Sequence, residues 1–210
     1  MKLGLIGTPV HQSISPELQK ILFDTFNLEG CTYEKNDISS EELSSFFDAF
    51  KAGAFDGINI TIPHKEHGLE FVDELDESVK ILGNANCITR KGNSLKGYNT
   101  DLYGFEMMLH HNDISVESKH CLVLGAGGSS KTIVKALIDG HAASITIKNK
   151  SMENALRIQA YAQAISDIDI QIFDKADIKF DLAINTTPLG MYQQDDKDDF
   201  FNIPIHQESI

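Results

Sequence analysis

The chain has 210 residues, enough for one large or two small domains, and its 41% apolar content is ordinary for a globular protein. The net charge of −13 argues against nucleic acid as a partner, and no apolar run is long enough for a membrane span or a secretion signal, so we expect a cytoplasmic protein. Three cysteines, Cys31, Cys87 and Cys121, lack metal-ligand spacing, so we predict buried thiols and no metal site.

Strands and helices alternate in the first half of the chain. The apolar pattern predicts strands at residues 3–6, 32–36 and 57–62 and helices at 15–26 and 41–51. Ser15 precedes Pro16 and is expected to be the N-cap of the first helix. One apolar face of that helix is formed by Leu18, Ile21, Leu22 and Phe26. This order predicts an α/β fold with a mostly parallel sheet and helices on its faces.

Shorter elements complete this half. We predict a helix at 75–82 that ends at Gly83, followed by strands at 85–89 and 94–98 around a hairpin turn at 91–93. From Asp101 a further helix runs to about residue 112, with its apolar side formed by Leu102, Phe105, Met108 and Leu109. We place the domain boundary in this helix, which gives domains of residues 1–103 and 104–210.

The second half repeats the alternation. We predict strands at 121–124, 144–147, 169–173 and 181–185, helices at 131–139 and 151–163, and an acidic loop at 192–199. Between the first of these strands and its helix lies a glycine-rich turn, made of Gly125, Ala126, Gly127, Gly128, Ser129 and Ser130. Such a turn permits close approach of a pyrophosphate to a helix N-terminus. The third glycine of the usual pattern is absent, so a merely tight turn is the alternative to nucleotide binding.

The end of the next strand bears on the choice of cofactor. An NAD enzyme usually carries a carboxylate there, which binds the ribose 2′-hydroxyl. This chain instead has Lys148, Asn149, Lys150 and Ser151, and Lys131 adds a further cation. Ammonium, amide and hydroxyl groups suit a 2′-phosphate, so the pattern favours NADP over NAD. The alternative is a solvated strand end.

Lys65 follows the third predicted strand, after Pro63 has ended it. The segment at 66–71 can turn helical, and a cation is electrostatically unfavourable at a helix N-terminus. Lys65 is therefore either an ammonium used in chemistry or a surface lysine after a turn.

Further polar residues lie at other strand ends. Ser13 and Ser15 form a hydroxyl pair that can hold a carboxylate, although Ser15 has the simpler role of N-cap available. A second group follows later strands and consists of Asn86, Asn99, Thr100 and Asp101. Asp101 has the same simpler alternative, as the N-cap of its own helix.

These motifs carry more weight together than alone. In the first half they are residues 7–16 (GTPVHQSISP), 59–65 (NITIPHK), Asn86 and 99–101 (NTD). In the second half they are residues 125–128 (GAGG), 149–151 (NKS) and 185–191 (NTTPLGM). In this order they resemble the motifs of the shikimate dehydrogenase family.

The resemblance implies a two-domain enzyme that reduces 3-dehydroshikimate to shikimate with NADPH in aromatic amino acid biosynthesis. Its N-terminal domain would bind this small-molecule substrate, and a Rossmann-like domain would bind NADP. Lys65 and Asp101 would form the catalytic pair. Substrate would be bound by Ser13, Ser15, Thr61, Lys65, Asn86 and Asp101.

The resemblance also assigns the cofactor site. Its residues would be Gly125, Ala126, Gly127, Gly128, Ser129, Ser130, Asn149, Lys150, Ser151, Thr187 and Met191. Lys150 stands where the family usually has Arg. Lysine keeps the charge but cannot make the bidentate contact of arginine, so we predict weaker NADP binding. Other departures are Thr8 for Asn, Gln12 for His, and residues 84–87 (NANC) for the family's usual sequence.

The C-terminal end departs further. In the family a further strand follows the segment at 185–191, and helices then return to the first domain with a substrate-binding Gln. The sequence stops at Ile210, so we expect a truncated chain with an unprotected edge of its second sheet. A monomer and a homodimer both remain open.

Three other functions remain in competition. A quinate/shikimate dehydrogenase able to use NAD is disfavoured by the lysines at 148–150. A truncated, catalytically impaired relative that binds nucleotide or a partner protein is favoured by the missing C-terminal part and disfavoured by the presence of Lys65 and Asp101. An enzyme of the methylene-tetrahydrofolate type shares the two-domain plan but does not predict the Ser13 and Ser15 pair.

Overall fold

A computed structural model describes residues 1–173 and 179–189 of the chain. The chain divides into two compact units, Met1–Thr100 and Asp101–Ile210. This division falls close to the predicted boundary after residue 103. The extents of the two functional domains themselves stay a prediction.

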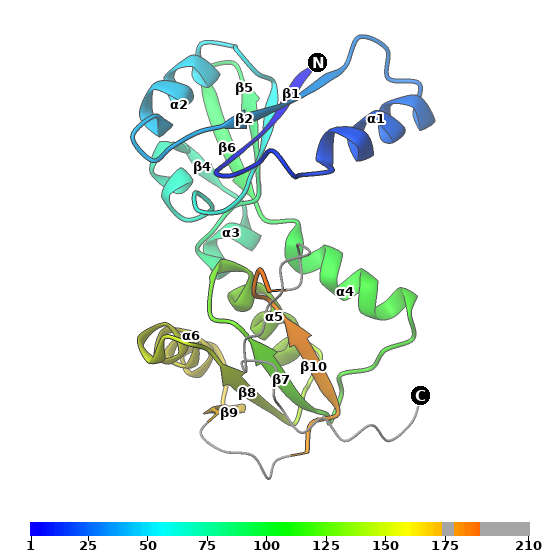
Figure 1. Ribbon diagram of the computed structural model, residues 1–210, viewed down its shortest axis with the longest axis vertical. Helices are drawn as coiled ribbons and strands as arrows, with labels where there is room; N and C mark the ends of the chain where they lie inside the picture. Colours follow the sequence, from blue (N-terminus) through cyan, green and yellow to red (C-terminus); the bar gives the residue numbers. More distant parts are fainter. Residues whose placement is uncertain (174–178, 190–210) are drawn as a thin grey trace. The chain divides into compact units, whose positions relative to one another are not determined.

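The first unit is built on a six-stranded sheet with the strand order β2-β1-β3-β5-β6-β4 (Figure 1). Its strands are β1 (Lys2–Gly7), β2 (Thr32–Asp37), β3 (Gly57–Ile60), β4 (Glu74–Leu75), β5 (Cys87–Lys91) and β6 (Ser94–Tyr98). β1 pairs in parallel with β2 and β3, and β4 in parallel with β6. β5 runs antiparallel to β3 and β6. The predicted α/β class is confirmed.

Apolar packing in this unit is concentrated on one face of the sheet. Its helices are α1 (Ser15–Thr25), α2 (Leu43–Lys51), the 3-10 helix η1 (His67–Phe71) and α3 (Glu77–Leu82). Phe47 and Phe50 of α2 belong to one buried cluster with Ile6, Ile58 and Ile60. Full burial of each such side chain contributes about 2 kcal/mol. This packing fixes β1 and β3, which Ser13, Ser15, Thr61 and Lys65 follow in the sequence.

α1 buries none of its side chains. Its predicted apolar face is present but exposed, with fractions of 53% for Leu18, 61% for Ile21, 37% for Leu22 and 66% for Phe26. The predicted N-cap role of Ser15 is wrong, because Ser15 is already helical and Ile14 is the cap residue. The cause is local, since the Ser13 hydroxyl accepts the Ser15 backbone N–H at 3.2 Å and Ser15 need not act as a cap.

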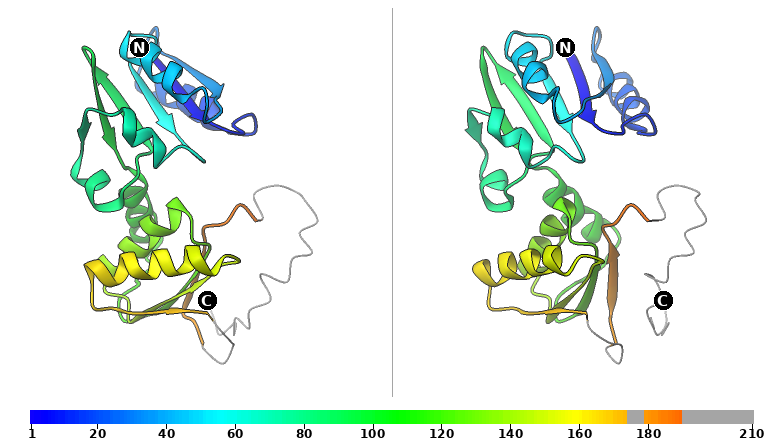
Figure 2. Two further views of the ribbon diagram at one scale, coloured as in Figure 1. Left: turned by 90° about the vertical axis from the view of Figure 1, so that its left-hand side faces the viewer. Right: turned by 60° about the vertical axis from the view of Figure 1, so that its left-hand side comes forward.

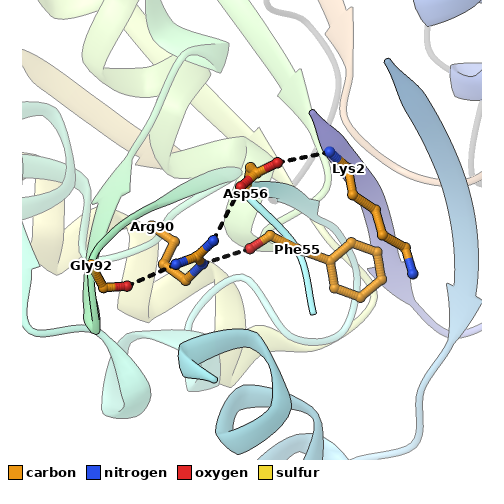
Figure 3. Close-up of polar contacts among 5 residues, drawn as sticks. All are labelled: Lys2, Phe55, Asp56, Arg90 and Gly92. Carbon is orange, nitrogen blue, oxygen red and sulfur yellow. Dashed lines mark hydrogen bonds and ion pairs between the residues drawn. The ribbon is translucent and has the colours of Figure 1, made fainter. Parts of the chain in front are cut away.

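Arg90 links chain segments at the amino ends of β1 and β3, which are the opposite ends from Thr61 and Lys65 (Figure 3). Its guanidinium donates to the carbonyls of Phe55 at 2.8 Å and Gly92 at 2.9 Å. It also pairs with Asp56 at 3.1 Å, and Asp56 accepts the Lys2 backbone N–H at 2.8 Å. These bonds connect β1, the segment before β3 and the β5–β6 hairpin.

Two smaller elements of this unit differ from expectation at their ends. The hairpin turn contains only Gly92, with φ +63°, and Asn93, because Lys91 pairs with Ser94 inside the ladder. α3 begins at Glu77 and not at residue 75, because Asp76 caps it by accepting the Ser78 backbone N–H at 3.1 Å. Gly83, with φ +66°, ends α3 as predicted.

The second unit contains a parallel sheet with the order β10-β7-β8-β9. Its strands are β7 (His120–Leu124), β8 (Ser144–Lys148), β9 (Asp169–Ile172) and β10 (Leu182–Asn185), and its helices are α4 (Asp101–His111), α5 (Gly128–Asp139) and α6 (Met152–Ile165). Figure 2 shows α6 lying across the strands. Side chains from all three helices share one buried cluster with Val123 and Ile145, so they cover one face. This is the Rossmann-like arrangement that was predicted.

Two expectations for this unit need correction, and a third concerns residues outside its described part. α5 begins at Gly128 and not at residue 131, because the last part of the glycine-rich turn is already helical. Met108 is 43% exposed and does not belong to a buried face of α4. The acidic loop at 192–199 lies outside the described residues.

The cysteines are all free, but only Cys121 is buried. Cys31 and Cys87 are half-buried, so the prediction of buried thiols is wrong for both. Within residues 1–173 and 179–189, no helix is long and apolar enough to cross a membrane. The same residues hold no group of three or more His, Cys, Asp or Glu side chains able to bind a metal ion.

Candidate functional site

Lys65 lies in the tight turn that follows β3, and its side chain is half-buried. Two backbone hydrogen bonds fix this turn to its neighbours. The Thr8 N–H donates to the Ile62 carbonyl at 3.0 Å, and the Ala85 N–H donates to the Lys65 carbonyl at 2.9 Å. The base of the Lys65 side chain is therefore held between the segments that follow β1 and precede β5.

His64 adds a side-chain link beside Lys65. It is fully buried, and its Nε2 lies 2.6 Å from the Ile38 carbonyl oxygen. Because a carbonyl only accepts, Nε2 carries the proton. Nδ1 is buried with no hydrogen-bond partner among the described residues. Sequence reasoning overlooked His64, which lies within the motif at 59–65 but carries no signal of burial.

Thr61 lies one residue beyond β3 and is half-buried. Its N–H donates to the Ile6 carbonyl at 2.9 Å, which continues the β1–β3 ladder. A Cβ on Gly7 would lie 2.5 Å from Thr61 Cγ2, so only glycine permits this approach of the two segments. The Gly7 of the first motif is thus explained by the Thr61 of the second.

The serine pair is brought together at the start of α1. Ser13 Oγ donates to Ser15 Oγ at 2.9 Å, in a partly buried position. The Ser13 N–H donates to the Val10 carbonyl at 3.0 Å, which fixes the loop. Two adjacent hydroxyls of this kind can both turn to a carboxylate, which only accepts hydrogen bonds.

Asn59 and Tyr33 connect the serine pair to β3. The Tyr33 hydroxyl donates to Asn59 Oδ1 at 2.8 Å, and Asn59 Nδ2 donates to the Asn86 carbonyl at 3.2 Å. Burial raises the pKa of Tyr33 to about 12, although a hydrogen bond from Ser15 acts in the opposite direction. Sequence reasoning overlooked both residues. Alternation places Asn59 on the same face as Thr61, but nothing local marks Tyr33.

The predicted group at 86–101 is only partly assembled within the first unit. Asn86 Nδ2 donates to Thr100 Oγ1 at 2.9 Å, and Asn86 Oδ1 accepts the Thr100 N–H at 2.9 Å. Asn99 is buried and donates to Asn84 Oδ1 at 2.6 Å. Asp101 begins α4 and belongs to the second unit. Its pairing with the Lys65 of the first unit stays a prediction.

In the second unit, the glycine-rich turn has the expected geometry. Gly125 has φ +107°, and a Cβ there would lie 2.5 Å from Thr186 Oγ1. A Cβ on Gly127 or Gly128 would meet no atom of the described residues within 4 Å, so among these residues open space lies beside both. Gly125 is required by the fold of the turn, whereas Gly127 and Gly128 leave room for a ligand to approach the backbone.

Ser130 is fully buried, and its hydroxyl is used inside the turn. Ser130 Oγ accepts the Gly127 N–H at 3.1 Å and lies 2.7 Å from Thr186 Oγ1. Thr186 Oγ1 donates to the Leu124 carbonyl at 2.8 Å. A contact between the Ser130 hydroxyl and a pyrophosphate would require these bonds to rearrange, and its role in cofactor binding stays a prediction.

The segments after β8 and β10 lie at the same end of the sheet as this turn. The Gly125 N–H donates to the Lys148 carbonyl at 2.8 Å. Asn149 Nδ2 donates to the Ser151 carbonyl at 2.9 Å, and the Ser151 hydroxyl caps α6 by accepting the Asn154 N–H at 3.3 Å. Lys150 is exposed. The structure thus brings the candidate 2′-phosphate residues beside the candidate pyrophosphate turn.

Thr187 belongs to a compact turn after β10. Its N–H and hydroxyl donate to Asn185 Oδ1 at 2.9 and 2.7 Å, and its Oγ1 accepts the Leu189 N–H at 3.2 Å. Thr187 Cγ2 also lies 3.0 Å from the position of a Cβ on Gly125, so this turn contacts the glycine-rich one. Met191, the remaining cofactor-site prediction, lies outside the described residues.

Comparison with known proteins gives the same family for both halves of the chain. Residues 5–88 match the model of the shikimate dehydrogenase substrate-binding domain, and residues 108–188 match that of shikimate/quinate 5-dehydrogenase. The shikimate dehydrogenase (NADP(+)) of Clostridium beijerinckii is 32% identical over 99% of this chain and 73% of its own length.

Two solved structures extend this likeness to the fold. The shikimate dehydrogenase of Aquifex aeolicus has a TM-score of 0.84 at 30% identity, over 96% of this chain and 73% of its own. The shikimate 5-dehydrogenase of Thermus thermophilus, solved with NADP(H) and shikimate, has a TM-score of 0.79 at 26% identity, over 90% and 69%. With both units, the motifs at their strand ends and the matched relatives in agreement, the chain belongs to the shikimate dehydrogenase family.

Proposed function

We propose that the chain catalyses the reversible, NADP-dependent reduction of 3-dehydroshikimate to shikimate, as a step in aromatic amino acid biosynthesis in the cytoplasm. The observation that carries the proposal is the group of polar side chains at the carboxyl ends of β1 and β3, in a chain of this family. The serine pair, Thr61 and Lys65 all follow those two strands. Ligands bind at such strand ends in open α/β sheets.

Each proposed substrate contact follows from the chemistry of the side chain. Ser13 and Ser15 donate to the substrate carboxylate. Thr61 and Asn86 bind ring hydroxyls, as does Asp101 from the second unit. The loop hydrogen bonds around Ser13 and Thr61 hold these donors and acceptors before substrate arrives, which lowers the entropic cost of binding.

Lys65 moves the proton in the proposed reaction. NADPH, when bound, supplies the hydride to the carbonyl carbon. The Lys65 ammonium gives a proton to the carbonyl oxygen, and in the reverse direction the amine takes it back from the hydroxyl. Asp101 orients the ammonium toward the carbonyl oxygen. The net change is one hydride and one proton added to the C=O bond.

The residues of the second unit fit the proposed cofactor. The open space beside Gly127 and Gly128 admits a pyrophosphate at the N-terminus of α5, where backbone N–H groups and the helix dipole favour an anion. Lys150 and Ser151 at the end of β8 suit a 2′-phosphate. No carboxylate occupies residues 148–151 to favour a free 2′-hydroxyl.

Substitution of Lys65 tests the reaction. We expect Lys65→Ala to lower kcat for shikimate oxidation by about 10²- to 10⁴-fold, because the proton acceptor is lost. NADPH formation measures kcat, and calorimetric titration with shikimate checks that binding is retained. The exposed Lys20→Ala on α1 serves as a control and should behave as wild type. Wild-type kcat in Lys65→Ala would contradict the proposed role, and a wild-type chain that turns over no shikimate would contradict the proposed function.

A further inference from the structure

We propose that His64 is a positioning residue for Lys65, and that the hydrogen bond from its Nε2 to the Ile38 carbonyl holds the turn at residues 61–65 against the segment after β2. The inference rests on the proposed function, because it takes Lys65 as the residue that moves the proton. It adds to that function a buried side chain and a segment to which no motif assigns a role. All of the residues concerned belong to the first unit.

The turn at residues 61–65 has a single buried side chain, that of His64. His64 is fully buried, whereas Ile62 is 63% exposed. Thr61 and Lys65, the two residues of the turn that are proposed to meet the substrate, are half-buried. His64 is therefore the side chain that fixes this turn to the interior of the unit.

The backbone of His64 joins the two ends of the turn. Its N–H donates to the Thr61 carbonyl at 2.8 Å, and its carbonyl accepts the Gly68 N–H at 2.8 Å. Gly68 in turn packs closely on β3, since a Cβ there would lie 2.4 Å from Ile60 Cδ1. A displacement of His64 would thus move Lys65 through the peptide bond and Thr61 through the hydrogen bond.

Ile38 connects this turn to the loop that carries the serine pair. The Ile38 carbonyl accepts from His64 Nε2 at 2.6 Å, and the Ile38 N–H donates to the Gly7 carbonyl at 3.0 Å. One residue earlier, Asp37 Oδ2 accepts the Val10 N–H at 3.4 Å. The His64 bond therefore joins the segments that follow β1, β2 and β3.

The geometry of the proposed substrate makes the spacing of these segments important. In 3-dehydroshikimate a six-membered ring holds the carboxylate and the reacting carbonyl at a fixed distance. The serine pair and Lys65 must therefore lie correspondingly far apart. A displacement of about 1 Å in a reacting group can cost about 10²-fold in rate. The His64 bond is placed to fix this spacing before the substrate binds.

The two ring nitrogens of His64 differ in their partners. Nε2 donates to Ile38, whereas Nδ1 is buried with no hydrogen-bond partner among the described residues. The amide nitrogen of glutamine lies two carbons beyond Cβ, as Nε2 does, and that of asparagine lies one carbon beyond, as Nδ1 does. Both replacements bury one amide group, but only glutamine can donate to the Ile38 carbonyl.

Substitution of His64 in the 210-residue chain tests the inference. We expect His64→Asn to lower kcat for shikimate oxidation by about tenfold, because the turn loses its link to Ile38. His64→Gln should restore kcat to within about twofold of wild type, because the donor is regained. Both variants should keep the Kd for NADP. The Kd for shikimate should change less than kcat does, because the serine pair is left intact.

A Lys65→Ala background distinguishes positioning from a purely structural role. If His64 acts through Lys65, His64→Asn should change the residual turnover of Lys65→Ala by less than about twofold. A purely structural histidine would lower that turnover by the same factor as in the wild type. His67→Asn, which changes an exposed histidine of η1, is the matched control and should behave as wild type.

Two further measurements keep the test decisive if His64→Asn folds poorly. Phenylalanine keeps a ring but has no donor, so His64→Phe should lower kcat as His64→Asn does. In the wild-type chain, above the ordinary histidine pKa of about 6.5, NMR nitrogen shifts should identify Nε2 as the protonated nitrogen. A proton on Nδ1 instead would overturn the inference.

Three kinetic results would also overturn the inference alone, provided that the wild type turns over shikimate. One is a wild-type kcat in His64→Asn. Another is an equal loss of kcat in His64→Gln and His64→Asn. The third is an equal fractional loss from His64→Asn with and without Lys65. A wild type that turns over no shikimate would instead overturn the proposed function, and the inference with it.

Discussion

At Gly125 both the backbone conformation and the packing require glycine. Its φ of +107° is strained for any residue with a Cβ, and that Cβ would lie 2.5 Å from Thr186 Oγ1. We expect Gly125→Ala to destabilise the second unit by about 1–3 kcal/mol. Thermal unfolding followed by circular dichroism measures the change.

Gly127 allows a comparison within the same turn. It has φ −95°, and a Cβ there would meet no atom within 4 Å in the part of the chain that the structure describes. Gly127→Ala should therefore leave the melting temperature nearly unchanged while weakening NADP binding, because the methyl group fills the space that a pyrophosphate needs. Equal melting temperatures for the two alanine variants would contradict the assignment of different roles to the two glycines.

At this scale the sequence predicts the residue types of the site better than their partners. The serine pair and the tight turn at Gly125 follow from local patterns, and the structure has both. The bond between Tyr33 and Asn59 joins residues 26 positions apart. It depends on the register of β2 and β3 against β1, which no local pattern contains. The burial of His64 depends in the same way on the loop around Ile38.

At the scale of elements, the Asp56–Arg90 pair joins the ends of several strands of the first sheet (Figure 3). The Lys2 backbone N–H lowers the pKa of Asp56, and the charge of Arg90 acts in the same direction. A lowered pKa stabilises the folded state above the carboxyl's ordinary pKa of about 4, and this contribution disappears as the pH falls through the lowered value.

Asp56→Asn should therefore lower the melting temperature at neutral pH, and the difference from wild type should shrink as the pH falls below about 4. Thermal unfolding over a pH series measures this. Asp24→Asn is the control, because Asp24 forms an exposed ion pair with Lys20 within α1, and loss of such a pair should change the melting temperature little. A difference for Asp56→Asn that grows toward acid pH would show that the sign is wrong.

Most errors of sequence-based prediction at this scale concern where helices begin. α5 starts at Gly128 because the tertiary contact of Ser130 with Thr186 and its local bond with Gly127 outweigh the low helix propensity of glycine. α1 has Ser15 inside it because Ser13 satisfies the N–H that Ser15 exposes. The alternation of elements was predictable because apolar periodicity reflects one buried face in helices such as α2, α5 and α6, although not in α1.

At the scale of the whole molecule, the exposed apolar face of α1 predicts self-association. Leu18, Ile21 and Phe26 are each more than half exposed, and lie together on one side of the helix. Contiguous apolar surface of this kind favours association in water. We expect the sedimentation coefficient of the wild type to rise with protein concentration, and Leu18→Gln combined with Ile21→Gln to reduce that rise.

Lys20→Gln, which changes the same helix away from its apolar side, is the matched control and should sediment as wild type does. A concentration-independent sedimentation coefficient for the wild type would contradict the prediction. Periodicity in the sequence identified this face, but not its exposure, because periodicity records where apolar side chains gather and not what covers them.

The strand order of the two sheets also has a consequence for the way the chain folds during synthesis. Every strand of the first sheet has been made once Tyr98 has emerged, so all of its strand pairs can form from that point on. In the second sheet β7 lies between β8 and β10, so its second neighbour is missing until Asn185 has been made. Long-range parallel pairing of this kind is slow to form. The first unit can thus fold on the ribosome while β7 still has one side unpaired, and that interval is when the apolar β7 is most exposed to aggregation.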